Sequence, residues 1–234
     1  MGSMRTIGLI HGMGSPSTAD FYVGVNDRVN ARLGGASRAE MLISSIDFSL
    51  VDAAVAAGDW DGLTELLVAR GLALESAGAD FLVIGSNTGH IAADAIREAA
   101  GIPLLHIADS IGTAADSLGA HRLAVLGTKP TMEESFYVEP LRERGFDVFI
   151  PDVDDREFLN RIVFEELTLG VFRDDTRARF LDVVDRMAGQ GADSVVLGCT
   201  EFGLLVGDAY KGTVPLIDSE QAHIDATVEA ALAD

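Results

Sequence analysis

Residues 78–88 read GADFLVIGSNT, and residues 191–201 read GADSVVLGCTE. Both segments start with Gly-Ala-Asp and continue with four mostly apolar residues and a glycine. The glycine is followed by a small residue whose side chain can donate a proton, which is Ser86 in the first segment and Cys199 in the second. An apolar strand followed by a glycine turn puts these side chains at the carboxyl ends of strands, where open α/β sheets bind ligands. We infer a duplicated unit, and we expect the two halves to aim a hydroxyl and a thiol at one shared cleft.

Short apolar runs alternate with longer helix-like stretches along the chain. The predicted strands are 6–10, 41–46, 81–84, 104–107, 123–126, 147–150, 194–197 and 214–217. The predicted helices are 18–33, 60–77, 91–100, 132–144, 157–167, 177–190 and 219–233. This alternation is typical of βαβ units with a parallel sheet, and strands that are apolar on both faces indicate helices on each side.

We therefore predict an α/β protein with two doubly wound domains. The first domain covers 4–115 together with the C-terminal helix 216–234, and the second covers 116–215. The boundary is expected within 111–121. Met1-Gly2-Ser3, ahead of Met4, looks like an expression remnant and is left out of the fold prediction.

The composition restricts the classes of partner. The chain has 37 acidic and 17 basic residues among 234, which gives a net charge of −20. Nucleic acids and anionic membranes are poor partners, because both are bound by basic surfaces. A carboxylate ligand would need local donors, because long-range attraction is unfavourable. One cysteine, no long apolar run and no signal-peptide pattern together predict a cytoplasmic protein.

Cys199 is the strongest candidate for chemistry. A lone cysteine is usually a buried core residue, but this one follows an apolar strand and precedes a segment that can start a helix. The positive end of a helix dipole favours the thiolate, so we predict a catalytic role. The case for Ser86 rests on its equivalence to Cys199. His90, one helical turn further on, is as suited to capping or packing as to catalysis.

Other polar residues follow the same strand ends. Asn87, Thr88 and Thr200 could bind a carboxylate or cap a helix. The turn at residues 12–18 lacks the third glycine of a dinucleotide motif and the lysine of a P-loop, so nucleotide binding is rejected. Arg38, just before the second strand, is the best candidate for binding a side-chain carboxylate.

Metals and cofactors are not expected. No dense cluster of histidine and cysteine has the spacing of metal ligands. Lys129 and Lys211, the only two lysines, lie in no obvious Schiff-base context, which argues against pyridoxal phosphate.

Several motifs, taken together, resemble the aspartate/glutamate racemase family of cofactor-independent amino-acid racemases. They are IGLIHGMG at 7–14 with Ser17-Thr18, SNTGH at 86–90, Gly127-Thr128, Thr131-Met132, Phe136-Tyr137, LGCTE at 197–201, PLID at 215–218 and His223. The resemblance implies two domains related by a pseudo-twofold axis, a substrate between them, a two-base mechanism without cofactor, and a homodimer. By position, Ser86 and Cys199 become the acid/base pair. The residues implied to line the pocket or hold the α-carboxylate are Met13, Ser17, Asn87, Thr88, Thr128 and Thr200.

Three positions depart from the family pattern. Most members have cysteine where Ser86 stands, and a subgroup with threonine there resembles L-aspartate/glutamate-specific racemases. Ser86 is either a native variant or an engineered Cys-to-Ser change. His11 stands where glycine is usual, and Glu40 stands where lysine is common.

The function predicted is α-proton exchange on a small acidic amino acid, aspartate or glutamate. Serine replaces the usual cysteine, so the activity is expected to be uneven on the two enantiomers or weak. One alternative is an isomerase or decarboxylase of a small diacid that uses Cys199 alone. The other is an amino-acid-binding protein without catalysis.

Overall fold

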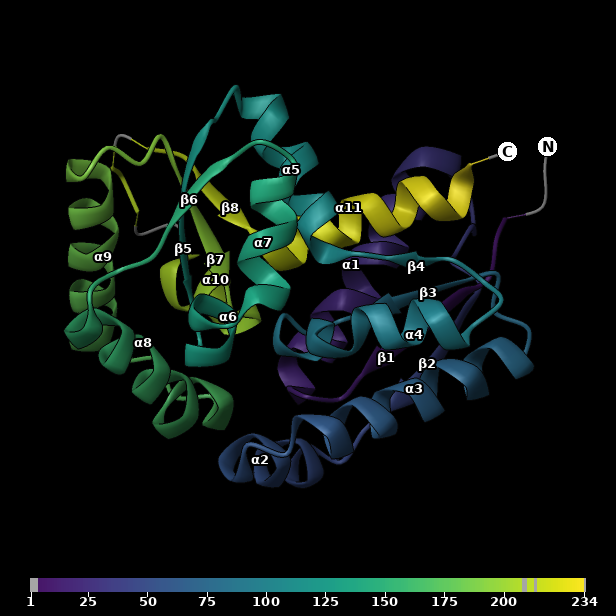
Figure 1. Cartoon of the computed structure of the whole chain (residues 1–234). Coiled ribbons are helices and arrows are strands. Elements are labelled where there is room, and N and C mark those ends of the chain that lie inside the picture. Colours follow the sequence, from purple (N-terminus) through teal and green to yellow (C-terminus); the bar gives the residue numbers. More distant parts are fainter. Residues whose placement is uncertain (1–3, 208–209, 213, 234) are drawn as a thin grey trace. The chain divides into compact units, whose positions relative to one another are not determined.

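The computed structural model describes residues 4–207, 210–212 and 214–233 (Figure 1). Met1-Gly2-Ser3 and Asp234 lie outside the described residues. The chain up to Ile107, together with the chain from His223 onward, forms one compact unit, and Ala108–Ala222 forms a second. None of the described helices is long and apolar enough to cross a membrane.

The first unit is built on a four-stranded parallel sheet. Its strands are β1 (Ile7–His11), β2 (Met41–Ser45), β3 (Phe81–Ile84) and β4 (Leu104–Leu105). Their order across the sheet is β2-β1-β3-β4. The helices are α1 (Ser15–Leu33), α2 (Phe48–Ala57), α3 (Trp60–Ser76), η1 (Thr88–Ala92), α4 (Ala93–Ala99) and most of α11 (Ser219–Leu232).

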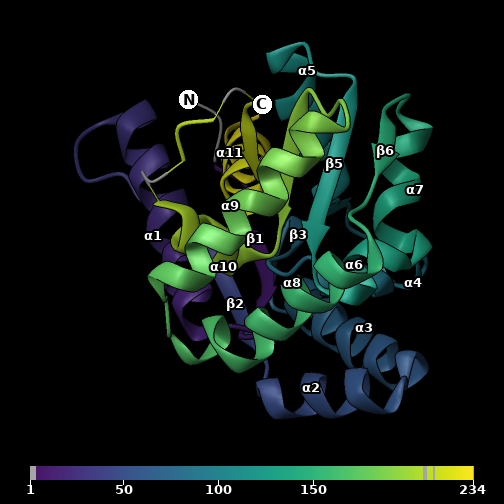
Figure 2. The same ribbon diagram turned by 90° about the vertical axis from the view of Figure 1, so that its left-hand side faces the viewer.

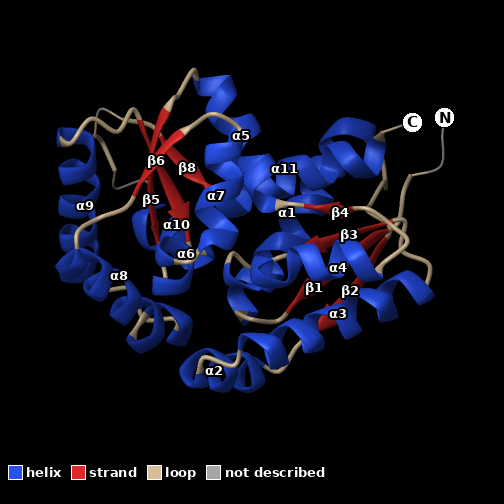
Figure 3. Ribbon diagram, viewed as in Figure 1, coloured by secondary structure: helices blue, strands red, loops and turns tan. Residues whose placement is uncertain are grey.

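Helices cover both faces of this sheet (Figure 3). Ile7 and Leu9 of β1 pack in one buried cluster with residues of α1 and α11, including Phe21 and Val228. Ile10 packs on the other side with residues of α2, α3 and α4. Successive side chains of a strand point to opposite faces, so the apolar sequence of β1 requires two helical layers. Full burial of one such side chain contributes about 1.5–3 kcal/mol.

The second unit repeats this plan. Its strands are β5 (Arg122–Gly127), β6 (Asp147–Phe149), β7 (Ser194–Gly198) and β8 (Leu216–Asp218), in the order β6-β5-β7-β8. The helices are α5 (Ile107–Leu118), α6 (Lys129–Glu133), α7 (Ser135–Glu143), α8 (Val153–Glu165), η2 (Leu167–Leu169), α9 (Asp174–Gly189) and α10 (Thr200–Val206). Within this unit α8 and α9 lie on one side of the sheet and α7 on the other (Figure 2). The predicted α/β class with parallel sheets is confirmed.

The repeated Gly-Ala-Asp has the same structural task in both units. Gly78 and Gly191 have φ of 101° and 95°, a region that favours glycine. The carboxylate of Asp80 accepts a hydrogen bond from the Thr6 amide at 2.6 Å, and that of Asp193 accepts one from the Arg122 amide at 3.0 Å. Each aspartate therefore ties the start of its strand to the start of the neighbouring strand and fixes the register.

Two helices were not predicted from the sequence. In helix α2, Phe48, Val51 and Val55 pack on the core at helical spacing, but apolar residues such as Leu50 also occupy the exposed side. The segment therefore shows no clear division into an apolar and a polar face. Helix α5 occupies most of the segment 111–121, in which the sequence placed the domain boundary. Small residues and Gly112 made that segment resemble a linker. Its buried side chains include Ile111 and Ala115, which lie on one helical face.

The close approach of β1 and β3 at Gly8 yields a stability prediction. A Cβ at Gly8 would lie 2.7 Å from the Ala79 Cβ and 3.2 Å from the Phe81 carbonyl oxygen. Gly8→Ala should therefore lower the free energy of unfolding by about 1–3 kcal/mol in urea titration. Gly189→Ala is the control, because no atom lies within 4 Å of its added Cβ. Equal stability of both variants would contradict this account.

Candidate functional site

Ser86 lies directly after β3 and Gly85, at the carboxyl edge of the first sheet. Its side chain is half-buried, and its Oγ accepts a hydrogen bond from the Gly89 amide at 3.3 Å. A Cβ placed on Gly89 would lie 3.3 Å from the Met13 Cε and 3.6 Å from the Ser86 Cβ. Met13 and Ser86 therefore border the same small region of the first unit. Asn87 is buried and Thr88 starts η1, so both follow Ser86 at this edge.

The turn after β1 reaches the same sheet edge. Gly12 has a φ of 98°, and a Cβ there would lie 2.5 Å from the Ile46 amide nitrogen, so only glycine fits. Ser17 is buried in the first turn of α1, and its hydroxyl donates to the Gly14 carbonyl at 3.1 Å. In this structure the Ser17 hydroxyl therefore stabilises the turn.

His90 does not act as a base toward the Ser86 hydroxyl. Its Nδ1 donates to the Ser86 carbonyl at 2.8 Å, and its Nε2 accepts a hydrogen bond from the Ile107 amide at 3.1 Å. Both ring nitrogens thus bind backbone groups. Of the two roles that the sequence left open, the structure supports packing and capping.

His90 belongs to a group of four buried histidines in the first unit. The ring centroid of His90 lies 4.7 Å from that of His106 and 5.7 Å from that of His223, and both pairs of rings are in edge contact. The Nδ1 of His11 accepts a hydrogen bond from the Gly12 amide at 2.9 Å. Among the described residues its buried Nε2 has no hydrogen-bond partner. Burial lowers the pKa of His11 to about 4 and that of His223 to about 3, and it lowers the pKa of His90 well below 6.5.

Cys199 and Thr128 are adjacent at the carboxyl edge of the second sheet. Gly127 and Gly198 are register partners at the ends of β5 and β7, so the next residue on each strand lies at this edge. The Oγ1 atoms of Thr128 and Thr131 lie 3.1 Å apart, and both side chains are buried. A Cβ at Gly198 would lie 2.8 Å from the Leu126 carbonyl oxygen, so the glycine is needed for this approach.

Glu201 is the residue that the sequence reasoning missed. The Cys199 thiol donates to the Glu201 Oε2 at 3.2 Å, and the Thr200 hydroxyl donates to the same oxygen at 2.8 Å. The Glu201 side chain is only 5% exposed. Its position two residues after the cysteine, across the first turn of α10, was the available signal. A buried carboxylate beside a thiol is a ready acceptor for the thiol proton.

The protonation state of Cys199 corrects a sequence expectation. The helix N-terminus was expected to favour the thiolate. Instead, burial raises the pKa of Cys199 well above its ordinary value, and the negative charge of Glu201 raises it further. The thiol is therefore protonated at neutral pH. The dipole of the seven-residue α10 is outweighed by the loss of solvent and by the adjacent charge.

Arg38 does not lie near Ser86. It is exposed, lies before β2 at the amino edge of the sheet, and donates to the Ser37 carbonyl. Ser86 lies at the carboxyl edge of the same parallel sheet. We therefore leave Arg38 out of the site.

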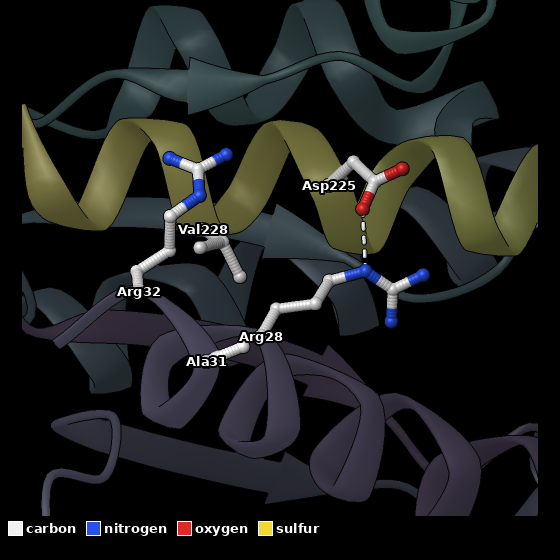
Figure 4. A pocket seen from close by; sticks show the side chains of 5 residues that line it. All are labelled: Arg28, Ala31, Arg32, Asp225 and Val228. Carbon is white, nitrogen blue, oxygen red and sulfur yellow. Dashed lines mark hydrogen bonds and ion pairs between the residues drawn. The ribbon is translucent and has the colours of Figure 1, made fainter. Parts of the chain in front are cut away.

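One surface hollow of the first unit lies between α1 and α11. It has a volume of about 260 Å³ and is bordered by Arg28, Ala31, Arg32, Asp225 and Val228 (Figure 4). Arg28 is paired with Asp225, and Arg32 is paired with Glu229. Both guanidinium groups thus have carboxylate partners. No group of three histidine, cysteine or acidic residues within the described ranges could hold a metal ion.

Two four-stranded parallel sheets with polar residues after their central strands define an α/β class shared with known racemases. The sequence pattern of the Asp/Glu/hydantoin racemase family matches residues 10–227. The chain therefore belongs to this family, which confirms the resemblance in the motifs.

Individual relatives agree along nearly the whole chain. The broad specificity amino-acid racemase RacX of Bacillus subtilis is 26% identical over 97% of this chain and 98% of its own length. The crystal structure of a proposed Asp/Glu racemase from Yersinia pestis is 38% identical, with a TM-score of 0.90 and coverage of 98% of this chain and 100% of that one. An aspartate racemase homologue from Pyrococcus horikoshii is 29% identical, with a TM-score of 0.81 and coverage of 97% and 99%.

The buried histidines predict a loss of stability in acid. Their pKa values are lower in the folded protein than the ordinary value near 6.5, so the unfolded chain binds more protons below that pH. This stabilisation is complete above about pH 6.5 and is lost as the pH falls toward the folded-state values. His11→Asn, which keeps an acceptor for the Gly12 amide, should reduce the loss between pH 7 and pH 5 by about 2 kcal/mol. Urea unfolding at both pH values measures it.

The matched control is His121→Asn, because His121 is exposed. If the free energy of unfolding depends on pH in the His11→Asn variant as it does in the unmodified chain, the His11 ring does not contribute to the acid sensitivity.

Proposed function

We propose that this chain catalyses cofactor-independent racemisation of a small acidic amino acid, aspartate or glutamate. The observation that carries the proposal is the buried Cys199 thiol after β7, hydrogen-bonded to the buried Glu201 carboxylate. Membership of a racemase family supports the reaction class. The choice of an acidic side chain rests on the family likeness.

Proton transfer starts from a protonated thiol. Glu201 accepts the thiol proton, and the resulting thiolate removes the α-proton from one face of the substrate. The Ser86 hydroxyl delivers a proton to the opposite face and is left as an alkoxide, while Cys199 is again a thiol and Glu201 is protonated. Transfer of the Glu201 proton through solvent to the Ser86 alkoxide restores both groups, and the reverse reaction retraces these steps. Each reactive atom must approach to about 3–3.5 Å from Cα.

The carbanion needs hydrogen-bond donors around the α-carboxylate. We assign this task to Asn87 and Thr88 in the first unit and to Thr128 and Thr200 in the second, with Met13 and Ser17 shaping the pocket. All of them except Ser17, which lies in the first turn of α1, lie within four residues of the end of a strand. With a net charge of −20, these local donors have to offset an unfavourable long-range field.

A second candidate is a decarboxylase or isomerase of a small diacid that protonates one face with Cys199 alone. It is favoured by the protonated thiol and by the engagement of His90, which leaves Ser86 without a histidine base. Racemisation of L-aspartate, compared with malonate decarboxylation and maleate isomerisation, separates the two. A protein that only binds amino acids would be stabilised by aspartate without turnover, even after Ser86→Cys.

We also infer a cytoplasmic homodimer, on the basis of the same family likeness.

The acid/base pair can be tested by isotope exchange. Cys199→Ala should lower exchange of the α-hydrogen with deuterated water by at least about 10³-fold for the enantiomer whose α-proton faces the thiol, and racemisation should be lost in both directions. Ser86→Ala should retain exchange from one enantiomer while racemisation is lost, and Ser86→Cys should increase racemisation. NMR measures exchange, and chiral chromatography measures the enantiomers.

Ser117→Ala, a hydroxyl removed from the exposed face of α5, serves as the control for general effects of substitution. Undiminished exchange of the α-hydrogen in Cys199→Ala would contradict the proposed mechanism.

Glu201→Gln tests whether Glu201 accepts the thiol proton, because the substitution should speed alkylation of Cys199 but slow racemisation. Removing the negative charge should lower the pKa of Cys199, so iodoacetamide should alkylate the thiol at lower pH. Racemisation should nevertheless slow by about 10²-fold, because the amide cannot accept the thiol proton. Glu134→Gln, an exposed acidic residue, is the control. Faster alkylation with an unchanged racemisation rate would show that Glu201 raises the pKa of Cys199 but does not accept its proton.

A further inference from the structure

The proposed reaction gives no task to two motifs of the second half, Phe136-Tyr137 and the PLID segment at 215–218. In the second unit they lead to two hydroxyl groups. Tyr137 lies in α7 and is fully buried. Ser219 directly follows PLID as the first residue of α11, and it is also fully buried. Because buried hydroxyl groups are normally hydrogen-bonded, the partners of these two show what they hold in place.

The Ser219 hydroxyl holds the carboxyl end of β7. Its Oγ donates to the Leu197 carbonyl at 2.7 Å. Strand β8 ends at Asp218, which is the register partner of Leu197. The hydroxyl therefore continues the bonding between β7 and this neighbouring segment one residue beyond the end of β8. Since Leu197 lies two residues before Cys199, the bond holds the backbone from which Cys199 and α10 start.

The Tyr137 hydroxyl completes a chain of hydrogen bonds. Burial raises the pKa of Tyr137 above its ordinary value, so the phenol is protonated, and it is hydrogen-bonded to the Ser219 side chain. Ser219 has one hydroxyl proton, and this proton goes to the Leu197 carbonyl. Tyr137 is therefore the donor and Ser219 Oγ the acceptor. Aligned hydrogen bonds polarise one another, so the phenol strengthens the bond from Ser219 to Leu197.

Tyr137 also lies against the residue that precedes Cys199. A Cβ placed on Gly198 would be 3.4 Å from the Tyr137 Oη and 3.1 Å from the Thr131 Cγ2. A negative charge on Cys199 would raise the pKa of Tyr137 further, so the phenol and the thiol are close enough to interact electrostatically. The Tyr137 hydroxyl thus contacts the backbone that carries Cys199, and through Ser219 it holds the carbonyl one residue earlier.

The position of this backbone determines what the Cys199 thiol can reach. The thiol donates to the Glu201 carboxylate at 3.2 Å, and Glu201 lies in the first turn of α10. In the proposed reaction the sulfur also approaches the substrate Cα to about 3–3.5 Å. A displacement on the order of 1 Å can slow such a reaction about 100-fold. The end of β7 therefore has to be fixed more closely than packing alone requires.

We propose that Tyr137 and Ser219 are positioning residues, which hold the end of β7 so that the Cys199 sulfur reaches both Glu201 and the substrate. Both hydroxyl protons are committed to this chain of hydrogen bonds, so neither group exchanges a proton with the substrate. The expected effect on the reaction rate rests on the proposed function. The expected effect on the hydrogen bond between the thiol and Glu201 does not depend on it.

Tyr137→Phe and Ser219→Ala each remove one hydroxyl. Each should lower kcat for racemisation about 10–100-fold with KM unchanged, because the groups assigned to substrate binding remain. Burial and the Glu201 charge both raise the pKa of Cys199. A thiol that moves away from Glu201 loses the second contribution, so iodoacetamide should alkylate it at lower pH. The double variant should be no slower than the slower single variant, because both hydroxyls act through one bond.

Thr227→Val is the matched control. The Thr227 hydroxyl is fully buried in the same helix and donates to the His223 carbonyl at 2.7 Å, but this bond lies within the first unit. The control should lower the melting temperature by about 2–4 °C, as Ser219→Ala should, yet keep kcat and the alkylation profile of the unmodified chain. Circular dichroism checks that each variant is folded.

Alkylation profiles of Tyr137→Phe and Ser219→Ala equal to that of Thr227→Val would overturn the positioning role, and so would an unchanged kcat in an active chain. If the unmodified chain racemises neither aspartate nor glutamate, the proposed function fails. The alkylation profiles then still decide whether the two hydroxyls position Cys199.

Discussion

The candidate site depends on the parallel register of the central strands in each sheet. Asp80 and Asp193 fix the start of that register by accepting hydrogen bonds from the neighbouring strand. At the other end, a glycine allows the backbone to turn with almost no space for a side chain, as at Gly198 beside the Leu126 carbonyl. The next residue of each strand is then held at the carboxyl edge. The same constraint, repeated by duplication, places Ser86 in one unit and Cys199 in the other.

Burial gives these edge residues their chemistry. Cys199 lies in a protein environment that disfavours charge, and Glu201 adds a negative charge beside it. The thiol therefore rests in its protonated form, and a base must take its proton before it can act. In the proposed mechanism the hydrogen-bonded Glu201 carboxylate takes that proton. This arrangement stores the proton within the site, where a water-exposed thiol would exchange it with solvent.

The buried histidines of the first unit hold backbone groups in place but make the folded protein less stable in acid. His90 binds two backbone groups and holds the loop that carries Ser86. The rings of His11 and His223 are kept neutral by the same lack of solvent that keeps Cys199 protonated. Positioning of the Ser86 loop and sensitivity to acid therefore have one physical origin.

The sequence by itself determined the α/β class, the position of most strands, and the placement of Ser86 and Cys199 after them. These features are local, because an apolar run, a glycine and a repeated Gly-Ala-Asp can be read along the chain. It did not reveal α2, whose apolar residues are not confined to one face, or the exclusion of Arg38, which lies at the edge of the sheet opposite Ser86. Only the tertiary structure decided the protonation of Cys199, its hydrogen bond to Glu201 and the hydrogen bonds of His90 to two backbone groups. Those properties depend on burial, on charges and on hydrogen-bond partners that residues acquire only when distant segments pack together.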